Sequence, residues 1–69
     1  MVEFVAKSSS KIIKSKIKDL RLPVNVNIGG YVRNGQGFIV AGDSVIEPGD
    51  HVICFCVASA IRKLESFFQ

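Results

Sequence analysis

The chain is poor in the side chains from which metal centres are built. Its 69 residues include one histidine, two cysteines and no tryptophan. On a strand, Cys54 and Cys56 would point to the same face and His51 to the opposite one, so the three cannot converge on one ion. We therefore expect no metal site, and we interpret the cysteines as small buried apolar residues.

Catalytic arrangements are also missing. No nucleophile or carboxylate accompanies His51 at a recognisable spacing. The carboxylates Asp43, Glu47 and Asp50 lie beside turns, without the convergence that acid–base catalysis needs. Asp50 is instead placed to accept hydrogen bonds from nearby backbone amides. The sequence therefore predicts a protein that is not an enzyme and has no catalytic residue.

Long hydrophobic runs are absent as well. The longest, residues 52–58, is far too short to cross a bilayer, and Met1 leads into a strand pattern without the features of a signal peptide. With 48% hydrophobic and 22% charged residues, the chain has the composition of a folded domain. We expect it to lie in the cytoplasm. Because a chain of this size buries only a small core, we expect oligomerisation to add stability.

Acidic residues are scarce in one stretch of the chain. The net charge is +3, and residues 7–21 contain a single acidic residue, Asp19, among six basic ones. The basic residues are Lys7, Lys11, Lys14, Lys16, Lys18 and Arg21. Such a stretch fits a solvated surface, or a surface for nucleic acid, anionic lipid or a phosphorylated ligand. It contains no aromatic residue on which bases could stack.

Apolar periodicity predicts a strand and then a short helix in the first third of the chain. In residues 2–6, Val2, Phe4 and Ala6 would share one face of a strand. Further on, isoleucines recur near a helical period, and Ser15 is a candidate N-cap for a short helix over residues 16–20. A proline at position 23 would stop this helix.

From residue 26 to residue 57 the pattern predicts a β-meander, and the alternation begins at residue 24. By simple alternation, Val32 would share a face with Ile28, and Arg33 would point to the other face. Two adjacent glycines at positions 29–30 indicate a bulge or a close backbone approach. The later segments are a returning strand at 37–40, a very short strand at 45–46 and a strand at 51–57. Apolar residues on both faces of the last strand predict a central position in the sheet.

Two turns join these strands. Asn34-Gly35, between apolar segments, is the signal of a two-residue hairpin, which needs a positive φ at both central positions. In Glu47-Pro48-Gly49-Asp50, the proline presets its own φ and the glycine accepts a positive φ, as a type II turn requires. We interpret both turns as structural devices.

The last segment has helical spacing. Residues 59–68 place Ala60, Ile61, Leu64, Phe67 and Phe68 at helical spacing, and Ser59 is a candidate N-cap. The predicted fold class is α+β, with a small antiparallel sheet in β-α-β-β-β-α order. A short helix follows the first strand, and a C-terminal helix packs on the sheet.

Three segments, in this order, carry a family resemblance. They are Lys16-Ile17-Lys18-Asp19-Leu20, Ile28-Gly29-Gly30-Tyr31-Val32-Arg33-Asn34-Gly35 and Val45-Ile46-Glu47-Pro48-Gly49-Asp50-His51-Val52-Ile53. With the order of the predicted elements, they resemble the TrkA C-terminal family, also called RCK-C, the C-terminal lobe of regulators of potassium conductance. The resemblance covers nearly the whole chain, which we treat as one domain over residues 1–69.

Membership would imply a regulatory domain that pairs into homodimers. In the family this lobe normally follows a nucleotide-binding Rossmann lobe, whose Gly-X-Gly-X-X-Gly pattern is absent here, so we expect a piece of a longer protein. The resemblance implies a cytoplasmic module, peripheral to the membrane through a potassium or other cation transporter. It would sense a ligand and gate the transporter by a two-state change, which requires different affinities for the two states.

The resemblance also implies a ligand site in the dimer cleft, where some family members bind a cyclic dinucleotide or another anion. The matching residues here are Leu20, Arg21, Asn27 and Ile28. Arg21 would meet a phosphate, and Asn27 a base edge or an amide. Leu20 and Ile28 would cover apolar surface. The chain would hold no cofactor of its own, and its effector would be a nucleotide or cyclic dinucleotide.

A second hypothesis starts from the basic stretch at 7–21. A small basic β-rich domain can be a nucleic-acid-binding or ribosome-associated protein, although the missing aromatic residues make nucleic acid the less favoured partner. Salt separates the two hypotheses, because affinity for nucleic acid falls steeply as salt rises. A dimer that does not respond to salt and does not bind nucleic acid would favour the regulatory module.

Overall fold

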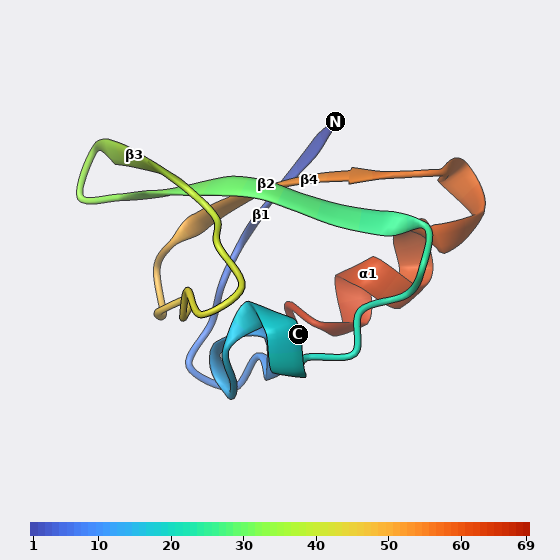
Figure 1. Ribbon diagram of the computed structural model, residues 1–69, viewed down its shortest axis with the longest axis horizontal. Coiled ribbons are helices and arrows are strands. Elements are labelled where there is room, and N and C mark those ends of the chain that lie inside the picture. The colour runs from blue at the N-terminus through green and yellow to red at the C-terminus, as the bar shows by residue number, and fades with distance from the viewer.

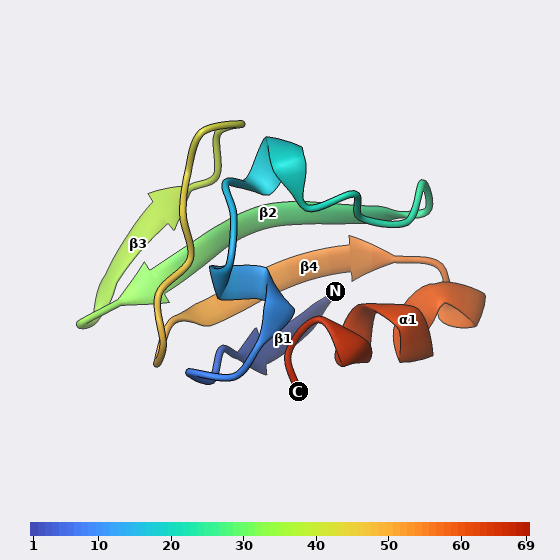
Figure 2. The ribbon, with the colours of Figure 1, turned by 90° about the horizontal axis from the view of Figure 1, so that it is seen from below.

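The computed structural model describes all residues from 1 to 69 and shows a four-stranded antiparallel sheet with the helical segments on one side (Figures 1 and 2). The strands are β1 (Val2–Val5), β2 (Val26–Arg33), β3 (Gln36–Ile39) and β4 (His51–Cys56), in the spatial order β1-β4-β2-β3. The 3₁₀ turns are η1 (Lys11–Ile13), η2 (Ile17–Asp19) and η3 (Ala58–Ala60), and the one α-helix is α1 (Ile61–Ser66). The predicted α+β class is confirmed. None of the helices has the length and apolar character that crossing a bilayer requires.

Strand β4 lies at the centre of the sheet, as its apolar residues on both faces predict. It pairs antiparallel with β1 on one side and with β2 on the other. Val52 and Cys54 point to the inner face, which the helical segments cover, and both are fully buried. Phe55 points to the uncovered outer face and is 48% exposed. His51 lies on the outer face too, opposite the cysteines, as expected.

A bulge interrupts β2. The register against β4 shifts between Ile28, which pairs with Cys54, and Gly30, which pairs with Ile53. Gly29 is therefore an extra residue in β2, and such an insertion reverses the face to which the following residues point. The two glycines indicated this bulge in the sequence.

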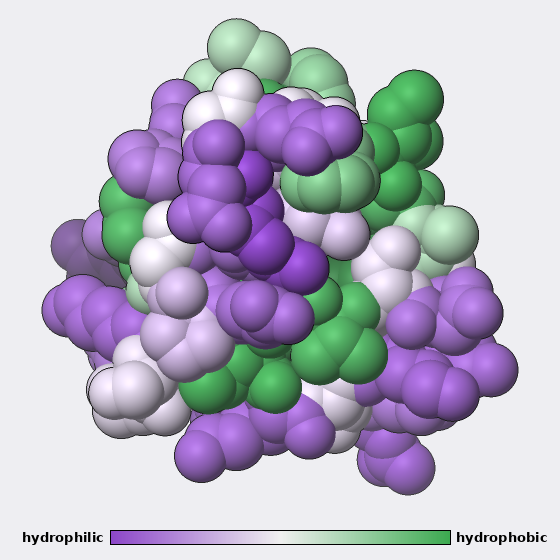
Figure 3. Space-filling view, turned by 90° about the vertical axis from the view of Figure 1, so that its left-hand side faces the viewer, coloured by the Kyte–Doolittle hydropathy of each residue, from purple (hydrophilic) through white to green (hydrophobic).

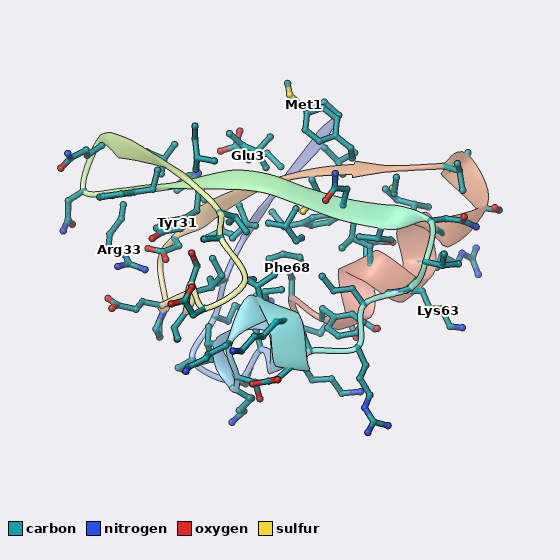
Figure 4. The ribbon with its side chains drawn as sticks, viewed as in Figure 1. Met1, Glu3, Tyr31, Arg33, Lys63 and Phe68 are labelled. Atoms are coloured by element: carbon teal, nitrogen blue, oxygen red, sulfur yellow. The ribbon has the colours of Figure 1, made fainter.

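The bulge corrects the faces that simple alternation assigns to the second half of β2. Tyr31 and Arg33 lie on the inner face together with Ile28, and Val32 lies on the outer face. Figure 4 shows Tyr31 and Arg33 on the same side of the sheet as Phe68. The alternation is intact on each side of the insertion, but its phase changes there, and the sequence did not reveal the change.

The helix predicted after β1 is replaced by two single turns. The segment Ile17–Asp19 is a 3₁₀ turn, and Lys16 rather than Ser15 takes its N-cap position, without a side-chain cap bond. A segment of a few residues forms too few backbone hydrogen bonds to offset the free-energy cost of nucleating an α-helix. The apolar residues of the segment nevertheless pack on the core; they are Ile12, Ile13, Ile17 and Leu20.

The segment between β3 and β4 forms no strand. Residues 45–46, predicted to be a very short strand, have no regular backbone structure. Ile46 is still 1% exposed and belongs to the core, so burial and not strand pairing explains its apolar side chain. An isolated apolar pair cannot distinguish these two situations in a sequence.

Both turns have the predicted backbone. In the β2–β3 hairpin φ is +53° at Asn34 and +76° at Gly35. In the turn before β4 φ is +91° at Gly49, and the Asp50 N–H donates to the Glu47 carbonyl at 3.1 Å. Local turn chemistry was therefore sufficient to place both reversals of the chain.

Helix α1 closes the core on the inner face. It follows η3 directly, and Ala60 rather than Ser59 occupies its N-cap position. Of the predicted stripe, Ala60, Leu64 and Phe68 are buried, whereas Ile61 and Phe67 are half-buried. The Phe68 ring stacks on Phe4 of β1, with the ring centroids 4.8 Å apart. This aromatic pair joins the two terminal segments of the chain.

Candidate functional site

A polar network closes the sheet where β2 finishes and β4 begins; we call this the closed end, and it consists of Arg33, Glu47 and Asp50. Arg33 donates from Nε and Nη2 to the two carboxylate oxygens of Asp50, at 2.9 and 2.7 Å. The Asp50 carboxylate also accepts from the Glu47 N–H at 2.9 Å, which confirms its predicted bond to a local amide. Since both oxygens of the buried carboxylate have donors, the network is a complete structural unit.

The network also sets the protonation of its members. Burial by itself would raise the pKa of Asp50, which is 1% exposed. Hydrogen bonds from Arg33 and Glu47, with the positive charge of Arg33, outweigh burial and hold the Asp50 pKa below its usual value. The same contact raises the pKa of Arg33. The guanidinium carbon also lies 4.9 Å from the centroid of the Tyr31 ring. The contacts of Arg33 with Tyr31 and Asp50 therefore give this side chain a structural role.

The outer face carries a side-chain contact between His51 and Glu3 that residue spacing did not reveal. Nδ1 of His51 lies 2.8 Å from Oε2 of Glu3, because β1 pairs with β4 and brings together residues 48 positions apart. Sequence spacing gave no sign of this contact, because the two residues meet only through the pairing of β1 with β4. Both side chains are about half exposed, which makes the pair a weak surface contact. In Figure 3 hydrophobic residues also reach the surface along the upper edge, where the outer face lies.

Where β2 begins and β4 finishes, the sheet has exposed side chains instead of a buried polar network. We call this the open end; it consists of Val24, Asn27, Phe55 and Val57. Val24 is 96% exposed, Phe55 48% and Val57 49%. Asn27 pairs with Phe55 in the ladder between β2 and β4. The Val57 N–H donates to the carbonyl of Asn25, which fixes this edge of the open end. Large apolar side chains left in water around a polar one are typical of an interaction site.

The structure divides the sequence-predicted ligand residues between the open end and the core. Asn27 is exposed at the open end. Ile28, the next residue, points to the inner face and is 7% exposed, so its side chain fills the core. Leu20 is half-buried against the core, and Arg21 is exposed. A single copy of the chain has no pocket that brings the four residues together.

Arg21 has an unusual backbone. It directly follows Leu20, the C-cap residue of η2, and its φ of +53° lies in the left-handed region, which costs a non-glycine residue about 1 kcal/mol. Val24 is three residues further on, so the two Cα atoms are at most roughly 11 Å apart. The side-chain hydrogen bonds and ion pairs of the chain use neither Arg21 nor Asn27. Both polar side chains therefore have no side-chain partner within the chain.

The cysteines carry no evident chemistry. Both are free thiols, and Cys54 is fully buried. Burial, with a smaller contribution from Cys56, raises the pKa of the Cys54 thiol to about 12. A thiol with this pKa stays protonated near neutral pH and is a poor nucleophile and a poor metal ligand. The structure shows no cluster of three or more side chains suited to a metal ion.

The sequence indicated single residues of each end, Asp50 and Asn27, but not their contacts with distant residues, for related reasons. Arg33 and Asp50 are 17 positions apart, and only the phase change in β2 turns the guanidinium toward the carboxylate. The open end had one local signal, an apolar residue at position 24 within a turn that begins at Pro23. The other members of the open end become neighbours only when β2 pairs with β4.

Comparison with known proteins places the chain in a family. Residues 1–69, the whole chain, match the TrkA-C domain. The Trk system potassium uptake protein TrkA of Halomonas elongata is 42% identical over 62 residues, covering 88% of this chain and 14% of that protein. TrkA of Azorhizobium caulinodans is 32% identical over 69 residues, covering 100% of this chain and 15% of that protein. The chain thus spans about one seventh of the length of these relatives.

Solved structures share the fold. An RCK domain with cda has a TM-score of 0.79 at 14% sequence identity, covering 99% of this chain and 96% of that chain. The RCK_C domain dimer of S. agalactiae BusR in complex with c-di-AMP has a TM-score of 0.80 at 20% identity, covering 97% and 86%. The family resemblance of the three sequence segments is confirmed: this chain belongs to the TrkA-C domain family.

Proposed function

We propose that the chain is the cytoplasmic regulatory domain of a potassium or other cation uptake system, and that it is one piece of a longer protein. Its family and the names of its relatives support this function, as does the small share of their length that it spans. In this role the domain pairs with a second copy, senses a ligand and catalyses no reaction. The ligand gates a membrane transporter by binding one of two states more tightly than the other.

The observation that carries the proposal is the open end. Its apolar side chains would leave water if two copies met there, and burial of apolar surface is the main driving force of association. A BusR domain of the same fold is a dimer in complex with c-di-AMP. We therefore put the ligand between two open ends, where each copy supplies half of the site.

Each residue of the proposed site has a role that follows from its position. The exposed Arg21 guanidinium meets a phosphate through charge-assisted hydrogen bonds, and the free Asn27 amide meets a base edge. Leu20 and Ile28 act from beneath, because their packing on the core fixes the backbone that carries Arg21 and Asn27. The strained backbone at Arg21 supports a functional position, since such conformations gather at ligand sites. The effector is a nucleotide or cyclic dinucleotide.

The test uses Arg21→Gly, because glycine accepts the positive φ while the variant loses the guanidinium. We expect binding of c-di-AMP, measured by titration calorimetry, to weaken by about tenfold or more, as for loss of a charge-assisted hydrogen bond. The free energy of unfolding should stay within about 1 kcal/mol of the original. Arg62→Ala, which removes an exposed arginine from α1, is the matched control and should bind normally.

Two results would contradict the proposal at different levels. If Arg21→Gly binds c-di-AMP as tightly as the original chain, Arg21 is outside the site. If the original chain stays monomeric and no nucleotide or cyclic dinucleotide raises its unfolding temperature, ligand sensing itself is wrong. A ligand at 100 times its Kd should stabilise the folded state by about 2.7 kcal/mol, which a thermal-shift assay detects easily.

A further inference from the structure

The segment between β1 and β2 separates apolar from basic side chains. Its isoleucines face the sheet; Ile12 is fully buried, and Ile13 and Ile17 pack on the core. Five lysines of the same segment are exposed; they are Lys7, Lys11, Lys14, Lys16 and Lys18, and we call them the lysine surface. The apolar side chains therefore occupy the sheet side, and the lysine side chains reach solvent; Nζ of Lys11 also lies 5.8 Å from the centroid of the Phe67 ring. Figures 1 and 2 show this segment, coloured blue to cyan, on the same side of the sheet as α1.

The lysine surface makes the molecule strongly polarised. Residues 7–21 hold six basic residues and one acidic residue, a net charge of +5, so the other residues together carry −2. No lysine of this surface contacts a carboxylate; the side-chain contacts with carboxylates join Arg33 to Glu47, Arg33 to Asp50 and His51 to Glu3. The positive charge is therefore not neutralised within the chain and is available to an external anion.

The composition and shape of the lysine surface favour a lipid surface over nucleic acid. Lysine is a point charge on a flexible stem, whereas the fixed geometry of phosphate and base recognition favours arginine. The segment has no aromatic residue on which a base could stack. Its only regular pieces are 3₁₀ turns of three residues, too short to lie along a groove of a duplex. A layer of anionic headgroups requires none of these features.

We propose that the lysine surface docks on the anionic lipid headgroups of a membrane. The inference rests on the proposed function only for the presence of a membrane nearby, since a regulator of a transporter works beside one. Each basic residue close to an anionic membrane strengthens binding by roughly fivefold. Five such residues give weak, reversible attachment, which becomes appreciable when two copies or a transporter hold the domain in place.

The test measures co-sedimentation of the full chain with vesicles of equal parts phosphatidylglycerol and phosphatidylcholine. We expect binding to these vesicles, no binding to pure phosphatidylcholine, and a steep loss of binding as salt rises. Lys14→Gln combined with Lys16→Gln should weaken partitioning on the order of 20-fold. The same two lysines changed to arginine keep the charge and should keep the binding.

Position is tested by a matched pair on α1. Arg62→Gln combined with Lys63→Gln removes the same charge from α1, and Figure 4 shows Lys63 beside that helix. We expect a much smaller loss than for the Lys14 and Lys16 pair. If both pairs lose binding equally, only net charge matters and the lysine surface is not a docking site.

Three other results would overturn the proposal. One is equal binding to anionic and neutral vesicles. Another is release from the vesicles by millimolar inorganic phosphate, which would make the stretch a site for small anions. The third is tighter, salt-sensitive binding to duplex or single-stranded nucleic acid, which would support the nucleic-acid hypothesis instead. None of these results depends on Arg21, so the vesicle experiment tests the lipid proposal separately from the proposed ligand site.

Discussion

The two ends of the sheet have opposite characters, although the same two strands build both. At the closed end, Asp50 is buried and its oxygens receive hydrogen bonds from Arg33 and Glu47. At the open end, Val24 and Phe55 remain in water, and the Asn27 side chain has no partner within the chain. The chain completes its polar contacts at one end and leaves apolar surface at the other. The closed end therefore contributes to stability within one copy, and the open end is the surface that we propose for association.

The largest effect should come from breaking the closed end. Asp50→Ala removes the acceptor of three hydrogen bonds, from Nε and Nη2 of Arg33 and from the Glu47 N–H. We expect the free energy of unfolding, measured with urea, to fall by about 2–3 kcal/mol. Asp43→Ala, in an exposed loop, is the control and should change it by less than about 0.5 kcal/mol. An equal effect of both substitutions would show that the network does not hold this end.

The next effect concerns the bulge between the two ends. A Cβ on Gly30 would lie 2.5 Å from the Phe38 carbonyl oxygen, so Gly30→Ala must move the backbone of β3. We expect a loss of about 1–3 kcal/mol in the free energy of unfolding. Gly37→Ala, where a Cβ would meet nothing within 4 Å, should be neutral or slightly stabilising in the same urea titration. A neutral Gly30→Ala would mean that the strands can separate there at no cost.

Acid should weaken the closed end selectively. The pKa of Asp50 is lower in the folded chain than in the unfolded chain. Its contribution to stability is therefore complete above the unfolded value, about pH 4, and is lost as the pH falls through the folded value. Urea titrations at decreasing pH should show this loss, and the acid slope should be shallower in Asp50→Asn. Identical slopes in the two proteins would assign the acid sensitivity to other carboxylates.

The smallest change in stability should come from the open end. Val24→Ser replaces a side chain that is 96% exposed, so the free energy of unfolding should stay within about 0.5 kcal/mol. Self-association, measured by sedimentation equilibrium, should weaken by about fivefold or more. Ile39→Ser is the matched control, since Ile39 is 90% exposed but lies on β3, away from the open end. If both variants weaken the dimer equally, the open end is not the contact surface.

The predictions from sequence succeeded where neighbouring residues decide the structure. Asn34-Gly35 and the Pro48-Gly49 pair set their turns through their own φ preferences, and the apolar stripe of α1 reflects one helical period. Predictions failed where the outcome depends on pairing between distant segments. His51 acquires Glu3 as a neighbour only because β1 lies beside β4. The prediction of a helix after β1 was wrong, because the packing of single isoleucines on the core, and not helix propensity, determines the backbone of that segment.

The candidate site divides in the same way. The resemblance selected Arg21 and Asn27, and the structure adds that both are exposed and make no side-chain contact within the chain. The resemblance put Ile28 in the same site as Asn27. Simple alternation along the strand places the two residues on opposite faces, and in the structure Ile28 is buried. The apolar neighbours of Asn27 could not be predicted, because they meet only through the pairing of β2 with β4.

The extra residue at Gly29 divides β2 into two halves whose side chains alternate between the faces with opposite phase. Residues 26–28 form the half at the open end, and residues 31–33 form the half that reaches Asp50. Deleting one residue at the junction would give both halves the same phase and turn Arg33 to the outside of the domain. A substitution in either half therefore leaves the phase of the other half intact, whereas a change of one residue in strand length at the junction does not.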